Sequence, residues 1–191
     1  MYWSNTPPEN EYNPKKRLGL VHVYTGEGKG KTSAALGTAF RAAGHKLQVL
    51  IVQFIKGHKD FGELQAFDNL KPYVDIVQFG TVETTDLHEP SAMDVYVANQ
   101  GMEFVRKAMV EKRPDVLVLD EINVAMHYGL VKTNEVLDFI DNKHQNTEVL
   151  LTGKHAPSAI LNAADLVTVM TSTKHPAKHD EDFTPRKGIE H

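Results

Sequence analysis

The chain has 191 residues, of which 41% are hydrophobic and 24% charged, a composition typical of one folded domain rather than of a disordered chain. Its 21 lysines and arginines stand against 25 aspartates and glutamates, so the net charge of -4 argues against a protein that coats nucleic acid or an anionic membrane. The absence of cysteine excludes disulfides, thiolate metal sites and cysteine nucleophiles.

The N-terminal segment, residues 1–17, differs in composition from the rest of the chain. It contains three prolines and few side chains to bury, and it has neither the basic start nor the apolar core of a secretory signal. No apolar run in the chain approaches the roughly 20 residues of a membrane span. We therefore expect a cytoplasmic protein with a flexible arm followed by one domain, residues 18–191. Tyr2 and Trp3 are unusual in a polar tail, so the arm is either a frayed terminus or a segment that docks over a site or a partner.

Segments with strand character alternate with segments with helix character from Leu18 onward. We expect strands at residues 18–24, 47–53, 74–79, 116–119, 148–151 and 166–170. We expect helices at residues 32–43, from near 91 to 113, and at 133–143 and 157–163. This alternation predicts an α/β fold, a mostly parallel sheet flanked by helices on both faces. In such a sheet, ligands bind in the crevice beyond the carboxyl ends of the strands.

The long helix in the middle of the chain has the clearest boundary signals. Ser91, after Pro90, is a suitable N-cap with Asp94 in the first turn, and Arg113-Pro114 ends the helix. Apolar residues recur along it at spacings of three and four: Val95, Ala98, Met102, Val105 and Met109. This stripe predicts one helix face packed against the sheet.

A loop rich in glycine and lysine between the first strand and the first helix is the strongest functional signal. It reads Thr25-Gly26-Glu27-Gly28-Lys29-Gly30-Lys31-Thr32, followed by Ser33. Backbone N–H groups of such a loop and of the helix start form a cradle for phosphates, while the lysine supplies charge and the Thr32 hydroxyl a Mg²⁺ ligand. The strict pattern G-x-x-x-x-G-K-[ST] is shifted by one residue, since Thr25 stands at the first glycine position and Gly26 follows it. The loop predicts a nucleotide site.

A pair of acids, Asp120 and Glu121, follows the continuous apolar strand at residues 116–119. In P-loop proteins an acid at this place holds the Mg²⁺ that bridges phosphate oxygens. The residues alone leave two roles for Glu121. It is either a metal ligand, or a general base that activates water, which would make the protein an ATPase.

Seven further segments occur in one order along the chain. They are Gln53-Phe54-Ile55-Lys56-Gly57, Leu119-Asp120-Glu121-Ile122-Asn123-Val124-Ala125, Tyr128-Gly129-Leu130, Thr152-Gly153, Ala156-Pro157, Lys174-His175-Pro176 and Lys187-Gly188-Ile189-Glu190. Together with the phosphate loop they resemble the ATP:corrinoid adenosyltransferases of the BtuR/CobA type, from about Leu18 to the C-terminus. The resemblance implies a RecA-like P-loop NTPase fold. It also implies transfer of the 5′-deoxyadenosyl group of ATP to the Co(I) centre of a reduced corrinoid, with release of triphosphate, in adenosylcobalamin (coenzyme B12) synthesis.

The resemblance also implies roles for particular residues. Lys31, Thr32 and the loop amides would neutralise the leaving triphosphate, with Mg²⁺ held by Thr32 and by Asp120 or Glu121. By analogy, Lys56 and Lys154 would face nucleotide or phosphate, although members usually have arginine at the position of Lys154, which grips phosphate with two donors rather than as a point charge. The family further implies a homodimer and an electron-donating reductase that supplies Co(I).

One segment departs from the family pattern. Many members carry Phe-x-Trp-Glu-Thr after the third strand, with aromatic residues lining the corrinoid pocket, whereas residues 79–86 here are shorter and place Val82 where the tryptophan would stand. The arm residues Tyr2 and Trp3 are candidates to supply aromatic surface instead. The residues select neither the corrinoid acceptor nor ATP over GTP.

Two rival interpretations of the whole chain remain on sequence grounds. An ATPase that uses Glu121 would release ADP and phosphate, and a non-catalytic binder would bind nucleotide and corrinoid without turnover. The histidines do not decide between these interpretations. His175 and His179 are expected in a solvated loop. Three others fall in loops at the crevice edge and have no assigned role: His88, His127 and His155.

Overall fold

The computed structural model of the chain describes residues 18–58, 60–81, 87–176 and 183–189. Its centre is a six-stranded sheet in the order β3-β2-β4-β5-β1-β6, and every neighbouring pair is parallel. The strands are β1 (Val21–Thr25), β2 (Val49–Phe54), β3 (Val74–Phe79), β4 (Val116–Asp120), β5 (Glu148–Thr152) and β6 (Leu166–Val169). The helices are α1 (Lys31–Gly44), α2 (Gly62–Asp68), α3 (Ala92–Glu111), α4 (Ile122–His127), α5 (Thr133–Asn142) and α6 (Ser158–Ala163).

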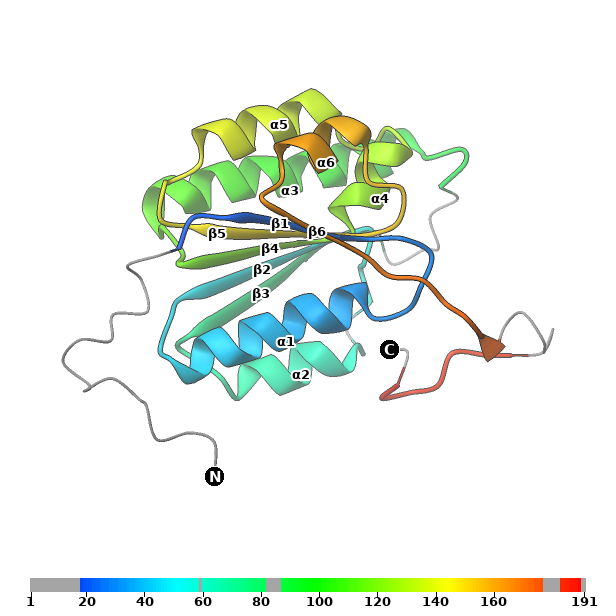
Figure 1. Ribbon diagram of the computed structural model, residues 1–191, viewed down its shortest axis with the longest axis horizontal. Helices are drawn as coiled ribbons and strands as arrows, with labels where there is room; N and C mark the ends of the chain where they lie inside the picture. Colours follow the sequence, from blue (N-terminus) through cyan, green and yellow to red (C-terminus); the bar gives the residue numbers. More distant parts are fainter. Residues whose placement is uncertain (1–17, 59, 82–86, 177–182, 190–191) are drawn as a thin grey trace.

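Helices cover both faces of the sheet, as the alternation predicted (Figure 1). α1 and α2 lie on one face, and α3, α4, α5 and α6 lie on the other. Buried alanines of α1, Ala35 and Ala39 among them, have no bulk beyond Cβ, so this helix lies close to the sheet. Every residue of β2 and β4 is buried, which explains their continuous apolar runs. The sheet therefore fixes the carboxyl ends of β1, β2, β4 and β5 side by side at one edge.

The structure confirms the N-cap and the buried face that the sequence predicted for the long helix, α3. Ser91 is the N-cap of α3 and forms a capping box with Asp94, in which each side chain accepts from the other residue's backbone N–H. Val95, the first residue of the predicted stripe, is partly buried and packs against the core. The other four residues of the stripe are buried: Ala98, Met102, Val105 and Met109.

Two short helices were missed by the sequence pattern. α2 and α4 have 7 and 6 residues and follow β2 and β4 at the crevice edge. Neither is long enough to show two turns of apolar periodicity, so their sequences looked like connecting loops. The predictions on residues 1–17, Val82 and His179 concern parts of the chain outside the described residues. In the described part, no helix has the length and apolar character needed to cross a membrane.

Candidate functional site

The phosphate loop runs from the end of β1 to the start of α1 and packs against the end of β6. Gly28 N–H donates to the carbonyl of Met170 at 2.8 Å. A Cβ at Gly26 would lie 2.4 Å from that carbonyl oxygen, and one at Gly28 would lie 2.7 Å from the carbonyl carbon of Thr171. Gly26 also has φ 96°, which side chains disfavour. The glycine shifted by one position therefore still makes the turn, and the loop is seated on the backbone of the neighbouring strand.

Lys31 is held inside this loop rather than extended into solvent. It is the first residue of α1, is 8% exposed, and its Nζ donates to the carbonyls of Gly26 at 2.8 Å and Gly28 at 2.6 Å. Burial lowers the pKa of Lys31, an effect that the nearby Glu121 carboxylate opposes. The loop is thus preshaped around one buried cation, as an anion site requires.

Asp120 is the centre of a buried polar network at the end of β4. Its side chain is 0% exposed, and four donors surround it. Thr32 and Thr152 each donate a hydroxyl to Oδ1 at 2.7 Å, while Gln53 Nε2 and Lys56 Nζ donate to Oδ2 at 3.0 and 2.9 Å. Burial alone would raise the pKa of Asp120, but Lys56 and the two hydroxyls hold it below its ordinary value. Asp120 is therefore an anchored, ionised carboxylate.

Glu121 stands beside this network in an unusual backbone conformation. It is the N-cap of α4 with φ 61°, in the left-handed region, and its N–H donates to Thr152 Oγ1 at 2.9 Å. Burial and the neighbouring Asp120 raise the pKa of Glu121, while Lys56 and Lys31 pull it down. A non-glycine residue in this conformation is strained, and such strain is concentrated at functional sites.

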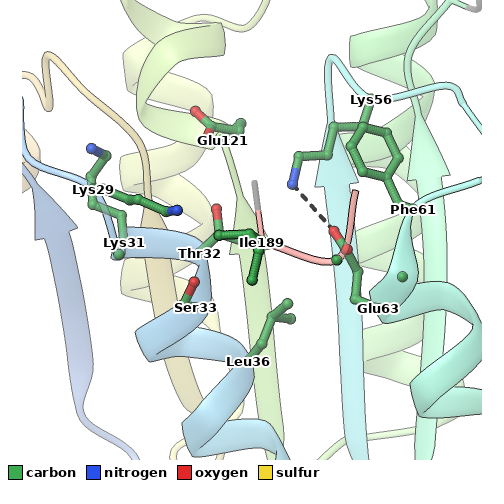
Figure 2. A pocket seen from close by; sticks show the side chains of 13 residues that line it. Lys29, Lys31, Thr32, Ser33, Leu36, Lys56, Phe61, Glu63, Glu121 and Ile189 are labelled. Atoms are coloured by element: carbon green, nitrogen blue, oxygen red, sulfur yellow. Dashed lines mark ion pairs between the residues drawn. The ribbon is translucent and has the colours of Figure 1, made fainter. Parts of the chain in front are cut away.

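These groups surround a cavity of about 400 Å³ at the carboxyl edge of the sheet. Figure 2 shows Lys29, Lys31 and Thr32 on one side of the cavity, Lys56, Phe61 and Glu63 on the other, and Glu121 between them. Its lining residues are Lys29, Gly30, Lys31, Thr32, Ser33, Leu36, Lys56, Phe61, Gly62, Glu63, Glu121, Gly188 and Ile189. Several cations and a helix N-terminus face one space, so the cavity suits a polyanion, and its apolar residues suit a ring or sugar.

The sequence of this chain was compared with those of known proteins and protein families. Residues 17–191 match the sequence model of the family described as ATP:corrinoid adenosyltransferase BtuR/CobO/CobP. The chain belongs to this family. A corrinoid adenosyltransferase of Sinorhizobium sp is 38% identical over 179 residues, covering 90% of this chain and 80% of that protein. That of Pseudomonas aeruginosa is 33% identical over 175 residues, covering 90% and 83%. Corrinoid adenosyltransferase CobA of Salmonella typhimurium is 33% identical over 162 residues, covering 84% and 81%.

A solved structure supports the fold of this corrinoid adenosyltransferase family member. The KaiC-like protein PH0186 of Pyrococcus horikoshii superposes with a TM-score of 0.53 and 16% identity, over 82% of this chain and 74% of that chain. At this identity the likeness concerns the fold alone. The parallel sheet, the phosphate loop and this likeness confirm the expected RecA-like P-loop architecture.

The sequence-predicted residues of this family member divide into three groups by their place relative to the cavity. Seven of them line the cavity: Lys29, Gly30, Lys31, Thr32, Ser33, Lys56 and Glu121. Thr25, Gly26, Glu27, Gly28 and Asp120 are not among the lining residues, but the first four belong to the phosphate loop and Asp120 accepts from the Thr32 hydroxyl, which does line the cavity. Lys154 does not line the cavity; it is 47% exposed and forms an ion pair of 2.8 Å with Glu27 of the phosphate loop. That pairing lowers the pKa of Glu27. Lys154 therefore contacts the loop from outside.

Sequence reasoning missed two sets of residues. Gln53, the last but one residue of β2, and Thr152, the last residue of β5, orient Asp120, and they were noted only as parts of family motifs. Leu36, Phe61, Glu63 and Ile189 line the cavity without having been assigned a role. Phe61 and Glu63 do follow the second strand, so their position at the carboxyl edge of the sheet was the available signal.

The histidines left unassigned by sequence gather around Tyr128 at the end of α4. The rings of His127 and His155 stack with centroids 4.4 Å apart, and Tyr128 meets His127 and His88 edge-on at 4.8 and 5.3 Å. The described residues contain no group of three or more histidine, aspartate or glutamate side chains suited to a metal ion. These histidines therefore contact one another and Tyr128 through their rings.

The donors around Thr32 suit a hard cation such as Mg²⁺. Because the Thr32 hydroxyl donates its proton to Asp120, its oxygen lone pairs remain available to a ligand in the cavity. Mg²⁺ prefers oxygen ligands, and it is usually held by one or two protein groups together with phosphate oxygens and water. Thr32 with Asp120 behind it and Glu121 beside it fits that pattern.

Proposed function

We propose that this chain transfers the 5′-deoxyadenosyl group of ATP to the Co(I) centre of a reduced corrinoid and that the cavity in Figure 2 is its ATP site. The observation that carries the proposal is the phosphate loop closed around Lys31 in a member of the corrinoid adenosyltransferase family. In this reaction a Co(I) electron pair attacks C5′, the bond from C5′ to the triphosphate oxygen breaks, and triphosphate leaves with that bond's electrons. Cobalt is formally oxidised to Co(III).

The protein's own work in this proposal is to hold the leaving triphosphate. Co(I) is a strong nucleophile, so no side chain need supply one. Loop N–H groups, Lys31 and the lysines that line the cavity, Lys29 and Lys56, would bind the negative charge that grows on the leaving group. Thr32 would hold Mg²⁺, with Asp120 orienting the hydroxyl and Glu121 as a further acid. When bound, Mg²⁺ supplies charge neutralisation to the triphosphate.

Two partners complete the proposal. Because the corrinoid acceptor must be reduced to Co(I), we expect an electron-donating reductase to reduce it. We also expect the chain to act as a homodimer. Mg²⁺, the reductase and the dimer are each open to direct measurement, by metal titration, by reconstitution and by light scattering.

ATP hydrolysis is the second candidate, and Glu121 is the observation that favours it. A carboxyl group whose pKa is raised by burial is a better base near neutral pH. An ATPase would use Glu121 to activate water and would release ADP and phosphate.

One anaerobic experiment separates the candidates. The protein is incubated with ATP, Mg²⁺ and chemically reduced cob(I)alamin, while the visible spectrum and the phosphate products are followed. A light-sensitive alkylcobalamin with one triphosphate per turnover supports the transferase. ADP and phosphate without cobalt alkylation support the ATPase, and binding of both substrates without products supports a non-catalytic binder.

A further inference from the structure

Lys56 is shared between two carboxylates that come from different parts of the fold. Its Nζ lies 2.9 Å from Asp120 Oδ2 at the end of β4 and 3.5 Å from Glu63 Oε1 in the first turn of α2. The Phe61 ring covers the same ammonium at 5.4 Å from its centroid. Figure 2 shows the Lys56–Glu63 pair at the wall of the cavity. Neither Glu63 nor Phe61 has a role in the proposed reaction so far.

A single buried amide joins the two carboxylates. Gln53 is 0% exposed and its Nε2 donates to Glu63 Oε1 and to Asp120 Oδ2, both at 3.0 Å. Its Oε1 accepts from Gln78 Nε2 at 3.0 Å, which fixes the orientation of the amide. Both protons of the Gln53 amino group are therefore used to hold Glu63 and Asp120 on either side of Lys56.

This arrangement restricts where the lysine head group can lie. A lysine side chain has four carbons and many rotamers, and its ammonium is a compact point charge, so one anchor leaves its position loosely defined. Asp120 Oδ2 is already shared with Gln53, whereas Glu63 and Phe61 approach from α2. The ammonium has three donor hydrogens, and Lys56 itself lines the cavity.

We propose that Glu63 is a positioning residue that holds the Lys56 ammonium where it binds the phosphates of the nucleotide. The inference rests on the proposed function in one respect, that Lys56 faces phosphate. In this role Glu63 strengthens phosphate binding, whereas its negative charge alone would weaken it. A carboxylate beside a phosphate site repels the ligand, so removal of Glu63 should strengthen phosphate binding unless the carboxylate is needed to place Lys56.

The test is the affinity of Glu63→Gln for tripolyphosphate and for ATP with Mg²⁺, measured by calorimetry in the absence of corrinoid. Glutamine has nearly the same size and keeps an oxygen for Gln53, so the variant is expected to fold. We expect binding of both ligands to weaken by about five- to tenfold, because Lys56 loses a charged anchor. In the adenosyl-transfer assay the KM for ATP should rise by the same factor, with kcat changed by less than about twofold.

Two further variants make the result specific. Asp68→Asn removes a carboxylate from the same helix, where Asp68 forms an exposed ion pair with Lys71, and should leave affinity unchanged. Phe61→Leu removes the aromatic face over Lys56 while keeping an apolar side chain, and should weaken tripolyphosphate binding in the same direction as Glu63→Gln.

Unchanged or tighter binding by Glu63→Gln overturns the inference, since the first result means no contribution and the second means simple repulsion. The adenosyl-transfer proposal can fail separately. If the unmodified protein forms no alkylcobalamin but Glu63→Gln still weakens tripolyphosphate binding, the positioning role stands without the transferase.

Discussion

The Thr32 hydroxyl donates a hydrogen bond of 2.7 Å to Asp120 Oδ1, which joins the first turn of α1 to the end of β4. These residues are 88 positions apart in the sequence, and only the parallel order of β1, β5 and β4 brings them together. The bond sets the direction of the hydroxyl, because its proton is committed to Asp120 and its oxygen faces the cavity. One contact therefore links the phosphate loop to the acid that supports a cation.

Thr32→Val should separate this role from stability. Valine has the same shape but no hydroxyl, so we expect Mg²⁺-dependent turnover to fall by about 10- to 100-fold. The free energy of unfolding should change by only about 1 kcal/mol, since Thr152 still donates to the same oxygen of Asp120. Thr38→Val is the matched control, because Thr38 lies in the same helix and donates to the carbonyl of Ala34, one turn earlier in that helix. Equal losses in both variants would show that the Thr32 hydroxyl has no special role.

Much of this architecture could be predicted from the sequence because strong local patterns encode it. The residues of β3 were predicted in full, and Ser91 is the cap of α3. The phosphate loop was predicted as a nucleotide site because the groups that bind phosphate, the glycine backbone N–H groups and the lysine, are spaced within one short segment of the sequence. Each of these features is determined by neighbours in the chain.

The parts that sequence reasoning missed depend on contacts between distant segments. Gln53 and Asp120 were each visible at a strand end, but their bond spans 67 positions. The ion pair between Lys154 and Glu27 of the phosphate loop joins segments far apart in the sequence, and the phosphate-facing role that family analogy gives Lys154 stays a prediction. The direction of a long side chain at a loop depends on the partner that it meets, and no local pattern encodes that partner.

Gly28→Ala should displace the phosphate loop from the end of β6. The new Cβ would lie 2.7 Å from Thr171 C and 2.8 Å from Met170 C, so backbone must move. We expect a loss of about 1–3 kcal/mol in the free energy of unfolding and weaker ATP binding by calorimetry. Gly37→Ala in α1 is the control, since nothing lies within 4 Å of its added Cβ, and it should stabilise the protein by about 0.5–1 kcal/mol. A Gly28→Ala protein with normal affinity would contradict the seating of the loop.

Glu121→Gln should lower activity while raising stability. The raised pKa of Glu121 means that folding opposes its ionisation, so its favourable contribution to stability is present below pH 4.5 and is lost as the pH rises through the folded-state pKa. A neutral glutamine avoids this loss, and the melting temperature of the metal-free variant should exceed that of the unmodified protein at pH 8 but not near pH 4.5. The Mg²⁺ concentration for half-maximal turnover should rise by about tenfold or more. A variant less stable at pH 8 would refute the assigned cost of burying this carboxylate.

Glu148→Gln tests a second carboxylate, at the opposite end of the sheet from the cavity. Glu148 accepts from the N–H groups of Gly19 and Leu20 at 2.8 and 2.9 Å and contacts His22 Nε2 at 2.7 Å. Burial alone would raise the pKa of Glu148, but these donors, His22 first among them, hold it below its ordinary value of 4.5. Ionised Glu148 thus favours the folded state, and this contribution is present above pH 4.5 and lost as the pH falls through the folded-state pKa.

Chemical denaturation at pH 7 should therefore show Glu148→Gln destabilised by about 1–3 kcal/mol, because glutamine keeps an oxygen for the N–H groups of Gly19 and Leu20 but lacks the negative charge that strengthens these hydrogen bonds. The difference from the unmodified protein should shrink as the pH is lowered below 4.5. Glu103→Gln, at an exposed position on α3 beside Gln100, should change stability by less than about 0.5 kcal/mol at any pH. A Glu148→Gln deficit that stays constant down to pH 3 would mean that the carboxylate's shape, and not its charge, holds the start of β1.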